Sequence, residues 1–336
     1  MAGLRVTLRD VARKVGVHPS TVSRVLNSST RSMVTLEIAR RVEDAAKELG
    51  YRPNPNAYGL KTNRSLTVGV VIPDLTDPLF PPIIRGIDDT LARAGYTTIV
   101  ANTDNDRARE CLILERMRGR RVDALILGST RRDDVLDGDD VPVVLINRSI
   151  DSGEVTAVVS DNAGGIGQVI DHLVSLGHRR IAHVGGPRFV TTGFARYQAY
   201  RSTMEGLGLP VKPELVEYSD SYSRGEGKRA LLLLLQSGER LTAVVAANDL
   251  LALGCYDALK AAGLDCPGDV SVTGFNDMPF VDMMDPPLTT VRIPQYDIGA
   301  AAARAVLERL NGAAGESETI VLPSTLVIRG STAPLP

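Results

Sequence analysis

Beyond residue 66 the chain repeats one pattern, in which a short apolar run is followed by a segment with helical periodicity. The first run, Thr67–Ile72 (TVGVVI), is rich in β-branched residues and predicts a strand buried on both faces. Further strands are predicted at Thr97–Asn102, Ala124–Leu127, Val143–Ile146, Ala157–Val159, Ile181–Val184, Ala243–Ala246 and Val270–Gly274, with helices at Pro82–Ala94, Gly165–Leu176, Ala195–Gly206, Gly227–Gln236 and Leu250–Ala262. This alternation is typical of doubly wound α/β folds with parallel sheets. About 270 residues are too many for one such sheet, so we expect two lobes with a cleft between them.

Polar residues directly follow several of these strands. They include Asn147-Arg148, Ser160-Asp161, Asn248-Asp249 and Asn276-Asp277. In open α/β sheets, ligands bind beyond the carboxyl ends of the strands. Carboxylates and carboxamides suit sugar hydroxyl groups, and the rings of Phe80 and Tyr222 are candidates to cover the apolar face of a sugar. Asp and Asn also favour turns and helix caps, and this simpler explanation is preferred for Asp74 and Asp104.

Charge is distributed unevenly along the chain. The net charge is −2 and the pI is near 6.1, yet residues 1–64 contain twelve Lys or Arg against five Asp or Glu. This head therefore carries +7 and the remaining 272 residues carry −9. A basic head joined to an acidic body indicates a module for nucleic acid or for an anionic membrane surface.

The basic head is predicted to form three short helices. Thr7 can cap the first, Gly16 ends it, and Pro19 stands where a second helix tolerates proline. A third helix is expected between Thr35 as its cap and Gly50. Two short helices joined by a tight turn containing glycine form a helix-turn-helix, whose second helix enters the major groove of DNA. A generic three-helix bundle with a solvated basic face fits the same periodicity.

The sequence LRDVARKVGVHPSTVSRVLN at residues 8–27, with Tyr51-Arg52-Pro53-Asn54 after it, resembles the DNA-binding head of the lactose-repressor (LacI/GalR) family. The resemblance extends to Arg329. It implies that Pro19, Ser20 and Arg24 read bases, while Thr21 and Ser23 contact phosphates. The implied DNA-binding residues are Thr7, Pro19, Ser20, Thr21, Ser23, Arg24, Asn27, Tyr51, Asn54, Ala57 and Leu60. His18 stands where the family usually has a serine cap, and histidine is a weaker cap.

Residues 51–64 alone indicate an interdomain linker, because they are too rich in Pro and Asn for a stable helix. The resemblance instead implies a hinge helix that orders on operator DNA and pairs with its dimer mate. Its leucine, Leu60 in this chain, would enter the minor groove. Asn56, Tyr58 and Gly59 depart from the usual residues, so we expect a weaker hinge helix.

The resemblance also implies a fold class and domain boundaries. The class is α/β, with an all-α helix-turn-helix head (1–50), a hinge helix (51–64) and a two-lobed, periplasmic-binding-protein-like domain of doubly wound parallel sheets (65–336). The N-lobe is expected at about 65–162 and 293–323, and the C-lobe at about 163–292 and 324–336. The effector-binding residues implied are Leu79, Phe80, Arg148, Asp161, Thr192, Arg196, Tyr222, Asn248, Asn276 and Asp277. Val190 replaces the arginine of the purine-binding member, which counts against a purine effector. A sugar or polyol is favoured by four of the implied residues together: Tyr222, Arg196, Asn248 and Asp161.

Other features narrow the class of protein. Three scattered cysteines indicate reduced thiols, and the chain has neither a signal-peptide core nor an apolar stretch of 18 residues, so we expect a cytoplasmic protein with no membrane partner. His172, His178 and His183 lack metal-ligand spacing and no G-x-S-x-G occurs, so we expect no enzyme, metal or cofactor.

The sequence thus predicts a homodimeric transcriptional regulator, a repressor that a sugar-like effector releases from a pseudo-palindromic double-stranded operator. No leucine heptad follows residue 330, so the tetramer of some relatives is not expected. A co-repressor-dependent regulator with a non-sugar effector, or a solute-binding protein, stays open as an alternative.

Overall fold

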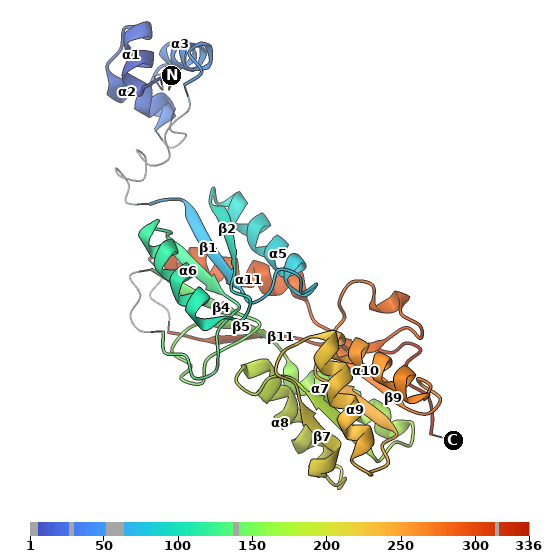
Figure 1. Ribbon diagram of the computed structural model, residues 1–336. Helices are drawn as coiled ribbons and strands as arrows, with labels where there is room; N and C mark the ends of the chain where they lie inside the picture. The colour runs from blue at the N-terminus through green and yellow to red at the C-terminus, as the bar shows by residue number, and fades with distance from the viewer. Residues whose placement is uncertain (1–5, 27–29, 52–63, 137–140, 313–315, 336) are drawn as a thin grey trace. The chain divides into compact units, whose positions relative to one another are not determined.

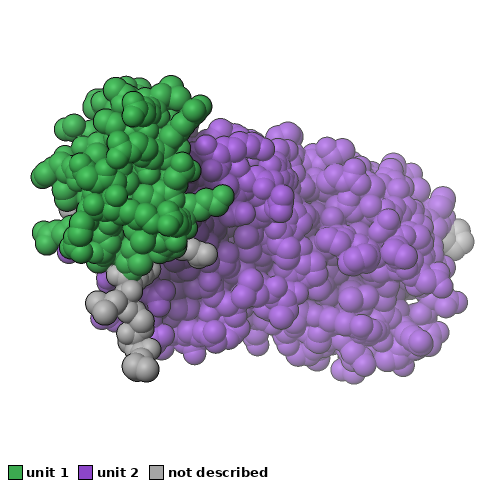
Figure 2. All heavy atoms as spheres, turned by 90° about the horizontal axis from the view of Figure 1, so that it is seen from above, with its two compact units in different colours: residues 1–65 green, residues 66–336 purple. Residues whose placement is uncertain are grey.

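The computed structural model describes residues 6–26, 30–51, 64–136, 141–312 and 316–335. The chain divides into two compact units, residues 1–65 and residues 66–336 (Figure 2). Each unit has its own hydrophobic core. The predicted hinge helix lies almost entirely outside the described residues.

The first unit contains three α-helices and one 3-10 turn among its described residues: α1 (Leu8–Val15), α2 (Pro19–Val25), η1 (Arg31–Met33) and α3 (Leu36–Glu48). Thr7 and Asp10 form a capping box at the start of α1, and Gly16 ends it with φ 75°. Thr35 precedes α3 as predicted but makes no side-chain cap bond. Val11, Val22 and Val42 anchor the small core between the helices.

The first sheet of the second unit has the strand order β11-β5-β4-β3-β1-β2, and all neighbouring strands are parallel. Its strands are β1 (Thr67–Ile72), β2 (Thr97–Asn102), β3 (Ala124–Leu127), β4 (Val143–Ile146), β5 (Ala157–Ser160) and β11 (Thr319–Leu322). The helices of this lobe are α5 (Phe80–Arg93), α6 (Arg107–Gly119) and α11 (Gln295–Leu310) (Figure 1). In β1, Val70 packs in the core that holds α5 and α11, whereas Val71 packs in the core that holds Met117 of α6. Helices therefore cover both faces of the sheet.

The second sheet has the order β12-β10-β9-β8-β6-β7 and is parallel except at β12, which runs antiparallel to β10. Its strands are β6 (Ile181–Gly185), β7 (Val216–Tyr218), β8 (Ala243–Ala246), β9 (Ser271–Asn276), β10 (Thr289–Arg292) and β12 (Thr325–Val327). The helices of this lobe are α7 (Asn162–Ser175), α8 (Thr191–Gly206), α9 (Arg224–Gln236) and α10 (Asp249–Ala262), with 3-10 turns η2 (Pro213–Leu215) and η3 (Val281–Met283). Every residue of β8 is buried, as expected for a strand covered on both faces.

Among the described elements, the chain crosses between the two sheets three times. The crossings lie between β5 and α7, between β10 and α11, and between β11 and β12. Because β11 and β12 each join a sheet built mostly from earlier residues, the two lobes are covalently interleaved. In two-lobed proteins, connections of this kind can serve as the hinge for closure of the lobes.

The predicted α/β class with two parallel-sheet lobes is confirmed. Several helices begin earlier than predicted, however, because polar side chains cap them before their apolar periodicity starts. Asp161 caps α7 by accepting a hydrogen bond from the amide of Gly164, and Ser223 caps α9 in the same way. Helices α6 and α11 and strands β7, β10, β11 and β12 were not predicted.

Candidate functional site

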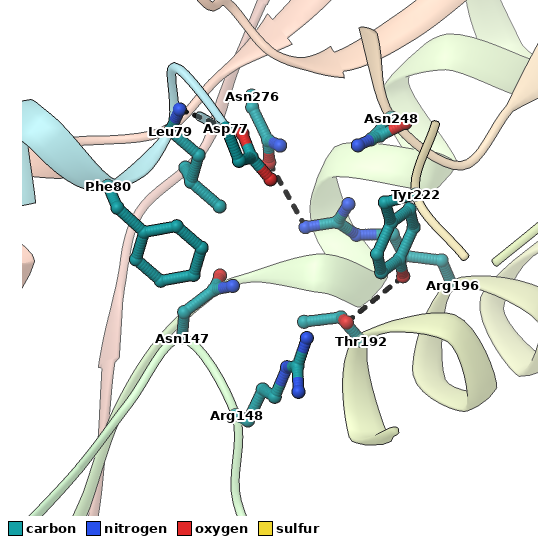
Figure 3. Close-up of a pocket in the computed structure, with 10 residues that line it drawn as sticks. All are labelled: Asp77, Leu79, Phe80, Asn147, Arg148, Thr192, Arg196, Tyr222, Asn248 and Asn276. Carbon is teal, nitrogen blue, oxygen red and sulfur yellow. Dashed lines mark hydrogen bonds between the residues drawn. The ribbon is translucent and has the colours of Figure 1, made fainter. Parts of the chain in front are cut away.

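A pocket lies where the carboxyl ends of the two sheets approach each other. Ten residues line it: Asp77, Leu79, Phe80, Asn147, Arg148, Thr192, Arg196, Tyr222, Asn248 and Asn276 (Figure 3). Every one of them lies at the carboxyl end of a strand or in the connection or helix that follows it. The pocket holds about 270 Å³ of space outside protein atoms, part of it open to solvent. The doubly wound topology therefore builds this site from both lobes.

Arg196, in the second turn of α8, is held by three neutral acceptors. Its Nε donates to Asn162 Oδ1 at 2.8 Å, Nη1 to the Ala247 carbonyl at 2.6 Å and Nη2 to Asn276 Oδ1 at 3.3 Å. Its guanidinium also lies 3.8 Å from the centre of the Phe275 ring. Burial lowers the pKa of this arginine. The side chain is therefore fixed in one position before any ligand binds.

Arg148 directly follows β4 and is also buried, but its hydrogen bonds are fewer. Its Nη1 donates to the carbonyls of Ser129 at 3.1 Å and Thr130 at 3.4 Å. Its Nε has no partner in the described structure, and neither has Oδ1 of the adjacent Asn147. Burial lowers the pKa of Arg148. One buried donor and one buried acceptor are thus left unpaired on the first-lobe side of the pocket.

Two asparagines of the pocket have strained backbones. Asn147 has φ 60° and Asn276 has φ 114°, values that residues other than glycine seldom adopt. Such conformations cost free energy and cluster at binding sites, where the surrounding structure maintains them. Both strained residues come directly after, or at the end of, a central strand.

Asp77 supplies the carboxylate of the pocket. Its Oδ1 accepts a hydrogen bond from the Leu79 amide at 2.9 Å, which orients it at the start of α5. Burial raises the pKa of Asp77 to about 6, and the nearby Asp74 acts in the same direction. That bond to Leu79, and the charges of Arg148 and Arg196, act in the opposite direction. This carboxyl group therefore titrates close to neutral pH.

The second-lobe side of the pocket also holds hydroxyl and amide groups. The hydroxyls of Tyr222 and Thr192 are hydrogen-bonded at 3.0 Å. The Tyr222 ring lies so close to Gly186 that a Cβ there would come within 2.4 Å of the phenol oxygen, which explains the glycine. Asn248 caps α10 through a bond from the Leu251 amide to its Oδ1.

The two lobes contact each other directly at one end of this pocket. The Arg132 amide donates to the Phe189 carbonyl at 2.9 Å, and the Ser149 amide donates to Thr191 Oγ1 at 2.9 Å. The Arg132 guanidinium lies 3.5 Å from the centre of the Phe194 ring. These contacts hold the lobes together beside the pocket, and they depend on how far the lobes are closed.

Eight of the ten residues predicted to bind the effector line this pocket. The other two, Asp161 and Asp277, do not. Asp161 is used as the cap of α7, and Asp277 forms salt bridges to Arg292 and Arg329, each at 2.7 Å. The sequence prediction missed Asp77, although its position after β1 and before α5 was a usable signal.

In the head, α2 presents a polar face. Ser20 and Arg24 are exposed, and Pro19, Thr21 and Ser23 are partly exposed. His18 does cap α2, since its Nδ1 accepts from the Ser20 amide at 3.2 Å. The exposed side chains are those needed to contact base edges and phosphates from the major groove.

Of the other predicted DNA contacts, Thr7 is exposed, Tyr51 is partly buried, and the rest are not described. The Thr7 hydroxyl donates to Asp10 at 2.7 Å. Tyr51 packs against the head core, and burial raises the pKa of its phenol. The predicted residues Asn27, Asn54, Ala57 and Leu60 lie outside the described residues.

A helix-turn-helix unit followed by a two-lobed α/β domain with an interlobe pocket defines a DNA-binding regulator that responds to a small ligand. The family model for bacterial regulatory proteins of the lacI family matches residues 7–54 of the sequence. The family model for periplasmic binding protein-like domains matches residues 170–332. The chain is 34% identical to the HTH-type transcriptional regulator RegA of Clostridium saccharobutylicum, over 98% of this chain and all of RegA. It is 33% identical to the HTH-type transcriptional repressor CytR of Escherichia coli K12, over 98% and 97% of the two chains.

Solved structures agree with these matches. A Lac repressor dimer bound to operator and the anti-inducer ONPF superposes with a TM-score of 0.88 at 27% identity, covering 98% of this chain and all of that one. A complex of the transcriptional regulator CelR with cellobiose gives a TM-score of 0.75 at 32% identity, covering 97% and 100%. The protein belongs to the LacI family of DNA-binding transcriptional regulators. None of the helices that the structure describes is both long and apolar enough to span a membrane.

Proposed function

We propose that the interlobe pocket binds a small sugar or sugar derivative, and that this effector releases the protein from its operator. The observation that carries the proposal is the pocket itself, in which polar groups of both lobes converge beside two aromatic rings. Relatives of this chain include the ribose operon repressor of Escherichia coli K12 and a regulator solved with cellobiose.

The effector would pair with the groups that the protein leaves unpaired. A sugar hydroxyl can donate to Asn147 Oδ1 and accept from Arg148 Nε in the same region of the pocket. Phe80 and Tyr222 offer ring surface to the apolar face of a sugar. Burying these two polar atoms against a ligand recovers hydrogen bonds that the free protein lacks.

Operator binding is proposed for the head and the hinge. Pro19, Ser20 and Arg24 would read bases, and Thr21 and Ser23 would contact phosphates. The remaining proposed contacts are those of Thr7, Asn27, Tyr51, Asn54, Ala57 and Leu60. A homodimer would present two heads to a pseudo-palindrome, with Leu60 of each hinge helix in the minor groove.

Effector and operator would be coupled through lobe closure. An effector that draws the lobes together changes the contacts of Arg132 and Ser149 with the second lobe. The first lobe is joined directly to residues 51–64, so its movement would unseat the hinge helices. Because the coupling is reciprocal, operator DNA must weaken effector binding by the same factor. We place this regulator in the cytoplasm and assign it binding rather than catalysis.

Selection of duplexes from random-sequence DNA, followed by a sugar panel, tests the proposal. Wild-type protein should capture a palindromic sequence, and Arg24→Ala or Leu60→Ala should abolish capture. One sugar should then release the DNA. Wild-type capture by both variants would refute the DNA-binding mode, and a sugar that tightens capture would make the protein a co-repressor-dependent regulator.

A further inference from the structure

Arginines are concentrated at the end of the first lobe where the strands of its sheet begin, although residues 65–336 are acidic as a whole. Strands β2, β1 and β3 are adjacent and parallel, and their first residues are in register: Thr67 pairs with Thr97, and Val68 with Ala124. The chain enters two of these strands through an arginine. Arg93 stands four residues ahead of β2, and Arg121 stands three residues ahead of β3.

The last turn of α6 adds more arginines at the same end of the lobe, because α6 leads into β3. Arg116 and Arg120 are four residues apart, so they lie on one face of the helix. Arg118 and Arg121 complete the sequence RMRGRR. We call this set the basic rim: Arg93, Arg116, Arg118, Arg120 and Arg121. All five are exposed.

Four arginines of the basic rim have no carboxylate within salt-bridge distance in the described part of the chain: Arg93, Arg116, Arg120 and Arg121. Basic residues near a helix C-terminus interact favourably with the helix dipole, and this accounts for one or two of these arginines. That explanation does not extend to Arg121, which lies beyond the end of α6 and precedes β3, and like charges four residues apart destabilise a helix. So many cations together indicate an anionic partner.

We propose that the basic rim binds backbone phosphates of the DNA that flanks the operator. This inference rests on the proposed operator binding and adds a contact from the first lobe. The connection from the head enters this lobe at Leu66, at the same end of the lobe as the rim. Duplex DNA presents a phosphate about every 3.4 Å along each strand, so a group of arginines at the starts of β2 and β3 meets several phosphates at once. Such contacts add affinity without reading sequence.

The test compares two duplexes that carry the selected operator. The short duplex ends at the outermost selected bases, and the long one adds about one and a half helical turns on each side. Wild-type protein should bind the long duplex more tightly. The variant Arg116→Gln/Arg120→Gln/Arg121→Gln should bind the short duplex as wild type does, and its affinity for the long one should fall roughly tenfold at low salt. Its salt dependence on the long duplex should also weaken, by roughly one unit of slope for each phosphate that the variant no longer neutralises.

A matched control removes the same charge from the corresponding end of the other lobe. Arg180 and Arg240 precede β6 and β8, and Lys260 ends α10; all three are exposed. The variant Arg180→Gln/Arg240→Gln/Lys260→Gln should behave as wild type on both duplexes. Equal losses of affinity in both variants would show general electrostatic steering and overturn the proposal.

Other outcomes are equally decisive. A rim variant that keeps the wild-type preference for the long duplex overturns the proposal and assigns the rim to another anionic partner, such as an acidic protein. The same holds if wild-type protein binds the two duplexes equally. Failure of wild-type protein to bind the short duplex would instead refute the proposed operator binding, so the two failures are distinguishable. Thermal unfolding of each variant shows that it is folded.

Discussion

Arg148 and Arg196 line the same pocket and are both buried. They differ in how many of their hydrogen-bond donors have partners within the protein. Arg196 donates to acceptors on three separate elements and stacks on Phe275. Arg148 donates only from Nη1, to two carbonyls of one neighbouring segment, and its Nε is unpaired in the described structure. A buried cation that lacks partners costs free energy, whereas a saturated one braces its surroundings. We therefore propose different roles for the two arginines: Arg196 braces the second lobe, and Arg148 binds the effector.

The comparison shows that lining a pocket is not a sufficient criterion for a ligand-binding role. Both arginines are among the residues that the sequence predicts to bind the effector. Their hydrogen bonds do separate them, because a donor already used by the protein must be released before it can bind a ligand. The predictions below test this division, from the largest expected effect to the smallest.

Arg196→Ala should have the largest effect, and on folding as well as on effector binding. It leaves Asn162 Oδ1, the Ala247 carbonyl and Asn276 Oδ1 without their donor, which should lower the free energy of unfolding by roughly 2–5 kcal/mol. For a domain of this size, this corresponds to a fall in Tm of roughly 5–15 °C, measured by thermal unfolding. Arg196→Lys should rescue little, because lysine cannot reproduce the planar guanidinium.

The control for Arg196 is Arg240→Ala, an exposed arginine of the same lobe, which should leave Tm nearly unchanged. If Arg196→Ala unfolded at the wild-type temperature, Arg196 would not be the brace that its contacts indicate, and the contrast with Arg148 would disappear.

Arg148→Met should show the opposite pattern. Removing a buried, incompletely paired charge while keeping the volume should leave the unfolding free energy unchanged or slightly higher. The affinity for a sugar identified in the panel should fall by roughly 10–100-fold, as expected when a charged hydrogen bond to the ligand is removed. Calorimetric titration measures this change in affinity. A large drop in Tm with normal sugar affinity would reverse the assigned roles.

Local sequence patterns were enough to predict most of the sheets. The runs at Thr67–Ile72, Thr97–Asn102 and Ala243–Ala246 coincide with strands because strands buried on both faces are uniformly apolar. The same reasoning fails at β7, a three-residue edge strand whose residues are all partly exposed. The predicted helix starts were wrong for a different reason, because a cap such as Ser223 precedes the apolar periodicity.

Residues that line the pocket could be predicted from sequence where their position directly after a strand places them there. Asn248 and Asn276 follow from that rule and line the pocket. Asp277 follows from the same rule but is bound by Arg292 and Arg329. That outcome depends on a partner 52 residues away in sequence, which no local pattern reveals. The difference in hydrogen bonding between Arg148 and Arg196 cannot be predicted from local sequence for the same reason.

Asp77 allows a pH test on the side of the pocket that holds Arg148. Its pKa of about 6 in the folded protein exceeds the ordinary value of 3.8, so the folded state holds this proton more tightly than the unfolded state. Asp77 therefore lowers stability as pH rises from about 4 to 6, and this destabilisation is complete above the folded pKa. Asp77→Asn should remove this dependence and be more stable than wild type at pH 7, by on the order of 1 kcal/mol after solvent screening.

The measurement is chemical denaturation of both proteins between pH 5 and 7.5. Asp249, whose pKa burial raises to about 7, gives the same sign of pH dependence in both proteins and cancels in the difference. A difference that stays constant over this range would show that Asp77 is ionised throughout, held so by the charges of Arg148 and Arg196.

Tyr222→Phe should have the smallest effect. It tests whether the side of the pocket that holds Arg196 is fixed by contacts within the protein. The Tyr222 hydroxyl bonds Thr192 Oγ1 within the second lobe, and the ring is fixed against Gly186. Removing the hydroxyl leaves this packing in place, so sugar affinity should fall only about two- to threefold. Tyr197→Phe, in the same lobe but outside the pocket, is the control and should leave affinity unchanged. A reduction as large as that of Arg148→Met would mean that the Tyr222 hydroxyl itself is a principal ligand contact, and that the second lobe is not merely the brace.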